Sequence, residues 1–471
     1  MFRSGKLQRS PRRDKRSRNQ AWLLLTVTLV LLTVLLTVFL FAATFNYRVI
    51  LQPTPWSPPL LLQRREPTPD LKRELWRQRN ASSSCTGEHA PGALDALRHN
   101  AAQYCGGLVR CLHRRLDYPE SFCEVSDLFV DLRRFTQYLN QPLAQEGDEP
   151  DSRDAYYVSG DPPQGMFSLR EGCLLNASLD LFHKGSSHDL RAGWGKSDDA
   201  HNACFVVDEP TVFLSKLYGK DNMWHASEDL LHTFENSELF GWRVGGHARL
   251  LVLDAPRSVT AQDRAQPYFP IYNSVFSPHY GYSTAWQFFD SLGNRSCVQF
   301  KKTYWQPHGG SSAFQRSVAT PSNCTNSPLI LGMVDTVLNT VLSEPISVEL
   351  GSVTVVVRNV STVRPVVSSA WSSFERAVRS NPQYHFVDFA TLNIVDQIKV
   401  AHASRTLIGL HGAALTHGLW MQPLSRLVEV DMGFRCYCYK NIASWVGIEY
   451  TLVPENQLAT LNLSADVISF L

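Results

Sequence analysis

Small residues follow a short apolar run in the segment LIGLHGAALTHGLWMQP, residues 407–423. The run predicts a strand that ends at His411, and Gly412, Ala413 and Ala414 then open a helix. In a parallel sheet, ligands bind at the carboxyl ends of strands, and the N–H groups of a helix N-terminus favour a diphosphate. The small residues would let a phosphate approach the backbone, and His411 could contact phosphate or ribose. The alternative is that they only let helix and sheet pack, because the segment is neither a GxGxxG nor a Walker loop.

A second group of reactive side chains lies in KLYGKDNMWHASEDLL, residues 216–231. His225 precedes Glu228 and Asp229 by three and four residues, which puts a base and two acids on one helical face. A displacement in which the leaving group departs from the opposite face needs such a base to take the proton of the attacking hydroxyl. A His225–Asp229 pair would supply the base and the group that orients it. The alternative is a helix cap, because Asn222 and the acids suit a first helical turn.

Two arginines, Arg358 and Arg364, accompany the strand expected at 352–358, in VVVRNVSTVRP. A guanidinium is a rigid, always-charged fork that can neutralise a departing diphosphate. The alternative is a pair of surface arginines, because the glycosylation acceptor Asn359 between them indicates that part of this loop is exposed.

Metal ligands are not expected. The chain contains no Asp-x-Asp, the pair with which many transferases hold Mn²⁺ on a diphosphate. The cysteine spacings do not resemble paired CxxC zinc sites either. The sequence therefore favours a site that works without a metal or another cofactor.

The elements that position these groups alternate regularly in the C-terminal part of the chain. Strands are expected at 352–358, 384–389, 405–410 and 426–431, and helices at 372–380, 393–403 and 412–422. Such alternation predicts a parallel, doubly wound sheet. Upstream, the apolar runs at 204–209 and 248–254 and a helical stretch at 227–240 indicate another α/β domain.

The N-terminus predicts a membrane anchor. Residues 21–45 carry no charge, and this stretch exceeds the ~20 residues that a helix needs to cross a bilayer. Eight basic residues and one acid precede it, which places the N-terminus in the cytosol and the remainder in the lumen. The alternative, a cleaved signal peptide, would have a shorter apolar region and a small-residue cleavage site. The anchored, type II reading is favoured.

Charge and composition set further limits. The net charge is +2, so removing the +7 of the first twenty residues leaves about −5 on the remainder, which implies no general affinity for nucleic acid. We expect a basic cytosolic tail at 1–20, the anchor at 21–45, a Pro-rich stem at 46–84, and domains at 85–345 and 346–471.

Cysteines and glycosylation acceptors agree with a lumenal address. All ten cysteines follow the anchor, and an oxidising compartment would pair several of them, with Cys436 and Cys438 as bridge halves rather than metal ligands. The Asn-x-Ser/Thr acceptors are Asn80, Asn176, Asn294, Asn323, Asn359 and Asn462. The C-terminus, VISFL, lacks a KDEL-type signal, so the Golgi is favoured over the endoplasmic reticulum.

The segment HFVDFATLNIVDQIKVAHASRTLIGLHGAALTHGLWMQPLSRLVEVD, residues 385–431, resembles the C-terminal motif block of glycosyltransferase family 61. In that family a strand is followed by HGAGLT and an apolar helix. Residues 216–231 are similar to the family's Asn-x-x-His segment, and the order of the two blocks agrees. The resemblance extends over roughly residues 170–455, and HGAALTH is its specific part.

The resemblance implies an inverting, UDP-sugar-dependent enzyme with a GT-B fold, in which two Rossmann-like domains face a cleft. The family includes EGF-domain O-GlcNAc transferases, a protein O-mannose β-1,4-GlcNAc transferase and plant β-1,2-xylosyltransferases, so GlcNAc or xylose would pass to a glycoprotein or glycan. By the same resemblance, the diphosphate is bound by Arg358, Arg364, His411, Gly412, Ala413, Ala414 and Thr416. Ala414 stands where the family often has glycine, which slightly enlarges the loop.

Two other functions stay open at this stage. A membrane-anchored glycan-binding or chaperone-like protein would keep the two-domain body without catalysis, and Ala414 fits that reading. A metal-dependent GT-A transferase or a sulfotransferase is disfavoured, because the chain has neither Asp-x-Asp nor a P-loop-like phosphate motif.

Overall fold

The structure is a computed structural model. It describes residues 84–114, 120–141, 143–144, 157–158, 162–169, 204–214, 222–243, 246–253, 255, 257, 267–307, 312–342, 353–357, 369–434 and 436–460. The predicted tail, anchor and stem up to residue 83 lie outside this range, as do Arg358, Arg364, Asn80, Asn176, Asn359 and Asn462. Within the described residues, none of the helices has the length and apolar character needed to span a bilayer.

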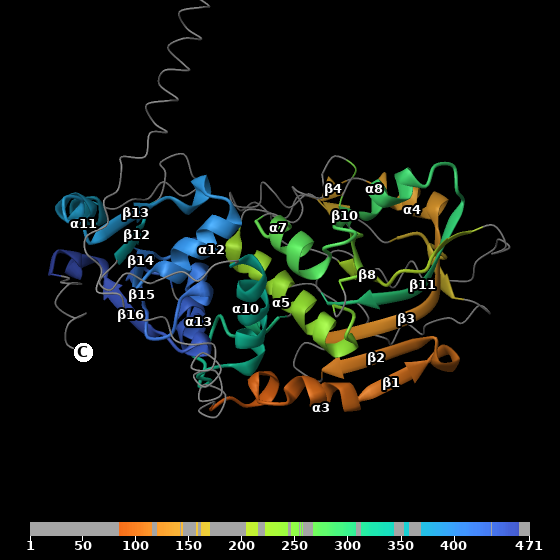
Figure 1. The fold of residues 1–471 in the computed structure, drawn as a ribbon, viewed down its shortest axis with the longest axis horizontal. Coiled ribbons are helices and arrows are strands. Elements are labelled where there is room, and N and C mark those ends of the chain that lie inside the picture. The colour runs from red at the N-terminus through yellow and green to blue at the C-terminus, as the bar shows by residue number, and fades with distance from the viewer. Residues whose placement is uncertain are drawn as a thin grey trace, which may run out of the picture. The chain divides into compact units, whose positions relative to one another are not determined.

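The first sheet has nine strands in the order β1-β2-β3-β11-β8-β9-β10, with β6 beside β3 and β7 beside β11 (Figure 1). Their bounds are β1 Ala101–Tyr104, β2 Val109–Arg114, β3 Glu120–Asp131, β6 Phe167–Leu169, β7 Phe205–Val207, β8 Thr211–Leu214, β9 Arg249–Val252, β10 Tyr282–Thr284 and β11 Cys297–Trp305. A separate pair joins β4 Leu143–Ala144 to β5 Tyr157–Val158.

This first sheet is mixed. Strands β1, β2, β3 and β6 pair antiparallel, and β3 also pairs antiparallel with β11. Strands β7 to β11 are parallel to one another where they pair. Short connections explain the antiparallel pairing of β1, β2 and β3, because parallel neighbours need a crossover of a dozen or more residues. The α/β class is confirmed, but only the parallel half of this sheet resembles the Rossmann-like domain expected from the sequence.

Helices stand before and between the strands of the first sheet along the chain, and two more follow β11. Their bounds are η1 Gly87–His89, α3 Ala93–His99, η2 Cys105–Gly107, α4 Leu132–Leu139, α5 Met223–Phe240, α7 Phe269–Ile271, η7 Tyr272–Phe276, α8 Ala285–Ser291, α9 Ala313–Arg316 and α10 Pro328–Val341. Helix α5 begins where the Asn222 side chain accepts the Trp224 N–H at 3.0 Å, and it ends at Gly241 with φ +69°. Both ends follow the usual rules for helix caps.

The second sheet has five parallel strands in the order β13-β12-β14-β15-β16. Their bounds are β12 Val353–Val356, β13 Tyr384–Val387, β14 Thr406–Leu410, β15 Arg426–Asp431 and β16 Glu449–Pro454. The helices are α11 Ser369–Val378, η9 Phe389–Thr391, α12 Ile394–Ala403, η10 Ala413–Trp420, α13 Cys438–Val446 and η11 Glu455–Thr460. The predicted parallel, doubly wound sheet is confirmed, although the segment after β14 forms a 3₁₀-helix.

Helices cover both faces of the second sheet, as its apolar strands require. Trp371 and Phe374 of α11 and Leu458 of η11 pack on one face. Helices α12, η10 and α13 pack on the other, where their side chains join a core that also contains residues of α5 and α10. Helices α5 and α10 therefore lie between the two sheets, and one continuous core connects them (Figure 1).

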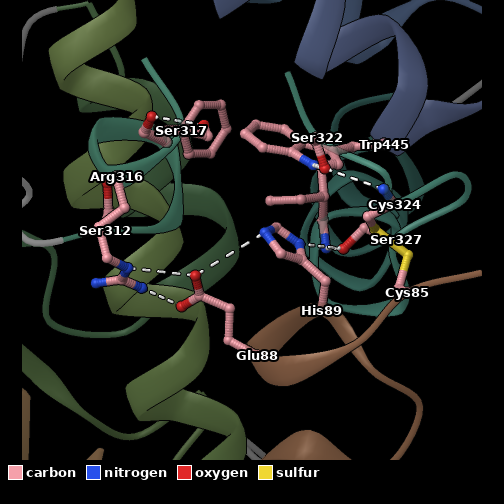
Figure 2. Close-up of polar contacts among 12 residues, drawn as sticks. Cys85, Glu88, His89, Ser312, Arg316, Ser317, Ser322, Cys324, Ser327 and Trp445 are labelled. Atoms are coloured by element: carbon pink, nitrogen blue, oxygen red, sulfur yellow. Dashed lines mark hydrogen bonds and ion pairs between the residues drawn. A yellow bond between two sulfur atoms is a disulfide. The ribbon is translucent and has the colours of Figure 1, made fainter. Parts of the chain in front are cut away.

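Contacts of residues 85–89 with the loop after α9 and with α13 stabilise this arrangement (Figure 2). Cys85 is disulfide-bonded to Cys324. His89 accepts or donates a hydrogen bond at 2.8 Å with Ser327 and stacks on Trp445 of α13 at a ring distance of 5.1 Å. Burial lowers the pKa of His89 to about 4, so this imidazole is neutral at physiological pH. The neutral ring can pack against the indole without the cost of burying a charge.

Glu88 forms the ionic part of the same network. It pairs with Arg316 of α9 and, at 3.2 Å, with Arg114 of β2. Arg114 also reaches Glu235 of α5 at 2.5 Å. Residues 85–89 are therefore linked to β2, α5 and α9 as well as to α13.

Asn441 of α13 fixes the loop after α9 to the second sheet. Its Nδ2 donates to the carbonyls of Ser317 and Thr320 at 2.8 and 2.9 Å, and its Oδ1 accepts the Ser322 N–H at 2.7 Å. The side chain is fully buried. One side chain therefore satisfies three backbone groups of a segment more than a hundred residues earlier.

We expect Asn441→Ala to lower the free energy of unfolding by about 2–3 kcal/mol, because three backbone groups lose their partners. The measurement is urea unfolding followed by tryptophan fluorescence. Asn381→Ala is the control: its side chain makes one exposed bond to the Gln383 N–H, and we expect a change within about 0.5 kcal/mol. Equal effects of the two substitutions would contradict the role given to Asn441.

Candidate active site

The strand order of the second sheet locates a crevice. Chain order runs β12, β13, β14, whereas β12 lies between β13 and β14 in space. The connections from β12 and β14 therefore leave on opposite faces, and doubly wound sheets bind ligands at the carboxyl ends of two such strands. Here these ends are Val357, after β12, and His411, after β14. The HGAALTH segment thus begins at the point where the fold itself predicts a ligand.

His411 is held from three sides. Its Nδ1 is hydrogen-bonded to Glu429 of β15, and its backbone N–H donates to the Val430 carbonyl at 3.1 Å. The imidazole stacks on Phe434 with ring centres 5.2 Å apart, and Tyr439 of α13 meets it edge-on at 5.2 Å. Its side chain is 12% exposed. The ring therefore has a defined orientation at the end of β14.

Glu429 is a buried carboxylate with a second partner. Its side chain is 3% exposed, and its Oε2 accepts the Tyr450 hydroxyl of β16 at 2.6 Å. Burial, followed by the neighbouring carboxylate of Glu429, raises the pKa of Tyr450 well above its ordinary value. Tyr450 therefore remains a hydroxyl donor, and three adjacent strands contribute one connected polar chain.

The small residues after His411 are compatible with both predicted roles of this segment, phosphate binding and close packing of helix and sheet. Ala413 and Ala414 are half-buried and pack against the core. A Cβ on Gly418 would lie 2.9 Å from Leu427, so glycine lets η10 approach β15 closely. At the start of η10 the Leu415 N–H donates to the Gly412 carbonyl at 2.9 Å. The N–H groups of the residues before Leu415 come ahead of this first helical bond, so the helix itself does not engage them. Packing and a backbone anion site are therefore compatible.

Thr416 and His417 lie deeper than the sequence suggested. Thr416 is fully buried, and its Oγ1 has no hydrogen-bond partner among the described residues. His417 donates from Nδ1 to the Ala414 carbonyl at 2.7 Å and stacks on Phe389 at 4.0 Å. Burial lowers the pKa of His417 to about 4. Both side chains belong to the core of η10, and the role predicted for Thr416 in donor binding stays a prediction.

On α5, the helix-cap reading of Asn222 is what the structure shows, and His225 follows in the first turn. The His225 Nδ1 lies 2.9 Å from Oε2 of Glu228, one of the two acids that the sequence placed on this helical face. The role predicted for Asp229 stays a prediction. Asp229 is 7% exposed and acts electrostatically on Tyr272 and Glu228.

Glu228 and His225 differ in their surroundings. Glu228 is fully buried, whereas the His225 side chain is 24% exposed. Burial raises the pKa of Glu228 to about 6, against the opposing effect of its hydrogen bond with His225. Above that pH the carboxylate holds the Nδ1–H of His225, so Nε2 is the nitrogen that can accept a proton.

The first turn of α5 and the HGAALTH segment are connected through aromatic side chains. Trp224 of α5 contacts Tyr439 edge-on at 6.0 Å, and Tyr439 contacts His411. A second connection runs from Ser227 of α5 to the Tyr268 hydroxyl at 3.0 Å, and Tyr268 packs on Trp420 of η10 at 6.1 Å. Residues almost two hundred positions apart are thereby held on one scaffold.

Other predicted sites fall on the surface or in disulfides. The acceptors Asn294 and Asn323 are exposed, as glycosylation requires. Cys436 and Cys438 are paired with each other, and further bonds join Cys111 to Cys123 and Cys204 to Cys297. Within the described ranges, no group of three or more His, Cys, Asp or Glu side chains could hold a metal ion. Independence from metal stays a prediction.

Sequence reasoning missed Glu429 and Tyr450. The signal for Glu429 was present, because this acid lies between the apolar residues Val428 and Val430 inside the strand RLVEVD. A buried charge in a parallel strand needs a partner, which points to the strand beside it. Tyr450 gave no comparable signal, since a tyrosine in a strand is ordinary.

A comparison with protein-family models matches residues 352–428 to the family described as Glycosyltransferase 61. The matched range runs from β12 into β15 and contains His411 and all of η10. No curated protein matches the chain.

The pKa of Glu228 gives a pH prediction for stability. Because the folded-state pKa is raised from 4.5 to about 6, the stabilisation is present below pH 4.5 and is lost as pH rises through about 6. Relative to Glu228→Gln, we expect the wild type to lose about 2 kcal/mol between pH 4.5 and 7. Urea unfolding at both pH values measures it, and Glu455→Gln in η11 is the control. A difference that does not change with pH would contradict the raised pKa.

Proposed function

From the match of residues 352–428 to the family described as Glycosyltransferase 61, we propose that the chain belongs to this family and is an inverting, metal-independent transferase of the secretory pathway. It takes a sugar from a UDP-sugar, with GlcNAc or xylose as the candidates, and passes it to a glycoprotein or glycan. The proposed arrangement is GT-B-like, with the donor in the C-terminal domain and the acceptor on the first. A type II anchor at 21–45 would hold the enzyme in the Golgi membrane.

One observation carries the proposal: the HGAALTH segment, which lies within the family match, begins at the strand-order reversal of a parallel sheet. This is the position at which the carboxyl ends of β12 and β14 and the start of η10 converge. Backbone N–H groups there favour a diphosphate. Arg358 follows Val357 directly in the chain, so it is the proposed cationic partner of that diphosphate, and Arg364, six residues later in the sequence, is the second candidate.

His225 is the proposed general base. In the transfer, the acceptor hydroxyl oxygen forms a bond to the anomeric carbon while the bond from that carbon to the diphosphate oxygen breaks. The hydroxyl proton passes to Nε2 of His225, and UDP leaves with the bonding electron pair. The 2.9 Å contact with Glu228 supports this role, because the ionised carboxylate fixes the tautomer and stabilises the imidazolium that forms.

Binding of UDP to the full-length protein in detergent is the first test. We expect UDP in EDTA-containing buffer to raise the melting temperature, since a ligand at about 100-fold excess over its Kd adds about 2.7 kcal/mol. His411→Ala should abolish the shift, and His385→Ala on β13 should keep it. No shift in the wild type at millimolar UDP would overturn the donor assignment. A shift that needs a divalent metal would overturn the proposed metal independence.

Hydrolysis of UDP-sugars tests the chemistry. We expect His225→Ala to lower donor turnover by about 10²–10⁴-fold, the usual contribution of a general base. The same variant should bind UDP as the wild type does, because His225 lies on α5 and not on the donor sheet. His279→Ala, an exposed histidine of the first part, is the control.

The assay uses a panel of UDP-sugars and also identifies the sugar. Full turnover by His225→Ala would remove this residue from the chemistry. UDP binding without turnover of any donor by the wild type would favour the inactive, glycan-binding alternative.

A further inference from the structure

Tyr268 carries a hydroxyl group that is buried in the core between the two sheets. The residue lies directly before α7, and none of its surface is exposed. Burial raises the pKa of this hydroxyl far above its ordinary value, so it stays a neutral donor. A phenylalanine would fill nearly the same volume without a polar group to desolvate, so close packing alone gives no reason for the hydroxyl.

The hydrogen bonds at this hydroxyl have a defined direction. Ser227 Oγ lies 2.8 Å from the Met223 carbonyl oxygen and 3.0 Å from the Tyr268 hydroxyl. A carbonyl oxygen only accepts, so the single hydroxyl proton of Ser227 goes to Met223, and Tyr268 donates to Ser227. Met223 is the first residue of α5, and His225 lies in the same turn. Tyr268 is therefore hydrogen-bonded to the turn that carries the proposed base.

The ring of Tyr268 contacts the other half of the candidate site. Trp420, the last residue of η10, meets it edge-on with ring centres 6.1 Å apart. The Trp420 indole is fully buried, and its backbone carbonyl accepts a hydrogen bond from His402 Nδ1 of α12 at 2.9 Å. The end of η10 is thus held in place, and Tyr268 joins it to α5.

The two kinds of contact constrain α5 differently. The Trp224–Tyr439 contact of the same turn is an edge-on ring contact, which tolerates small shifts. The bond from Tyr268 to Ser227 does not, because a hydrogen bond weakens steeply with distance and angle. A general base must lie within about 3.2 Å of the proton that it takes, so such a constraint bears on the chemistry.

We propose that Tyr268 is a positioning residue of the transfer reaction: its bond to Ser227 and its contact with Trp420 set the distance between His225 and the HGAALTH segment. The inference rests on the proposed function, since it needs His225 as the base and the donor on the second sheet. Tyr268 acts through α5 and not on the substrate.

Turnover of UDP-sugars by the full-length protein in detergent is the first test. We expect Tyr268→Phe and Ser227→Ala each to lower kcat about tenfold or more, because the base is displaced from the reacting hydroxyl. The KM for the donor and the Kd for UDP should not change, since the donor sheet is intact. The double variant should lose no more than either single variant, because all three lack the same bond.

Two matched controls lie in the first part of the chain. Tyr304→Phe removes the hydroxyl of another buried tyrosine, on β11. Ser237→Ala removes a hydroxyl of α5 that donates to the Phe234 carbonyl at 2.6 Å, within the helix. We expect both to keep the wild-type kcat. Wild-type kcat in Tyr268→Phe and Ser227→Ala, whatever their stability to urea, overturns the proposal, as does a loss that appears in KM alone.

Amide hydrogen exchange of the same proteins tests the connection without a ligand. We expect Tyr268→Phe to speed exchange about threefold or more in peptides covering 223–231 and 413–420, and to leave β11 unchanged. Unchanged exchange in residues 223–231 overturns the proposal. Ser227→Ala removes the same bond and leaves the ring in place, so it decides the question if Tyr268→Phe does not fold. A wild type that turns over no donor overturns the proposed function, and the exchange experiment still decides whether Tyr268 holds α5.

Discussion

The packing of α5 against the helices of the second sheet is the constraint on which the candidate site depends. Side chains of α5, α10, η10 and α13 form one core, so the first turn of α5 cannot shift without disturbing helices on the C-terminal sheet. Protein interiors are dense enough to transmit such a displacement. This core holds the first turn of α5 in place, and the Trp224–Tyr439–His411 contacts connect that turn to the end of β14.

Each of the two histidines of the candidate site is hydrogen-bonded to a buried glutamate, but the two glutamates come from different kinds of element. Glu228 supports His225 from one helical turn further on, whereas Glu429 supports His411 from the adjacent strand. The low dielectric around a buried carboxylate strengthens its effect on a neighbouring imidazole, and it also makes an unpaired carboxylate costly. Each pair therefore joins a buried acid to a ring that is closer to the surface.

The sequence predicted the second sheet well and the first one only by class. Its strands are short apolar runs separated by amphipathic helices, so their positions and parallel direction follow from local patterns. The antiparallel half of the first sheet depends on the short connections between β1, β2 and β3, which a composition-based reading does not resolve. His225 and His411 were found because local motifs surround them. Glu429, Tyr450 and Tyr439 were missed, since what makes them important is contact across strands or between domains.

The disulfides differ greatly in how much chain they enclose. Cys85 and Cys324 are 239 residues apart. By the loop-closure relation, their bond lowers the conformational entropy of the unfolded chain and so stabilises the folded protein by about 5.5 kcal/mol. Cys436 and Cys438 are two residues apart, and the same relation gives about 1.5 kcal/mol. The short bridge contributes little to holding the protein folded. Its main effect is local: it constrains the start of α13, which carries Tyr439, one of the two rings that flank His411.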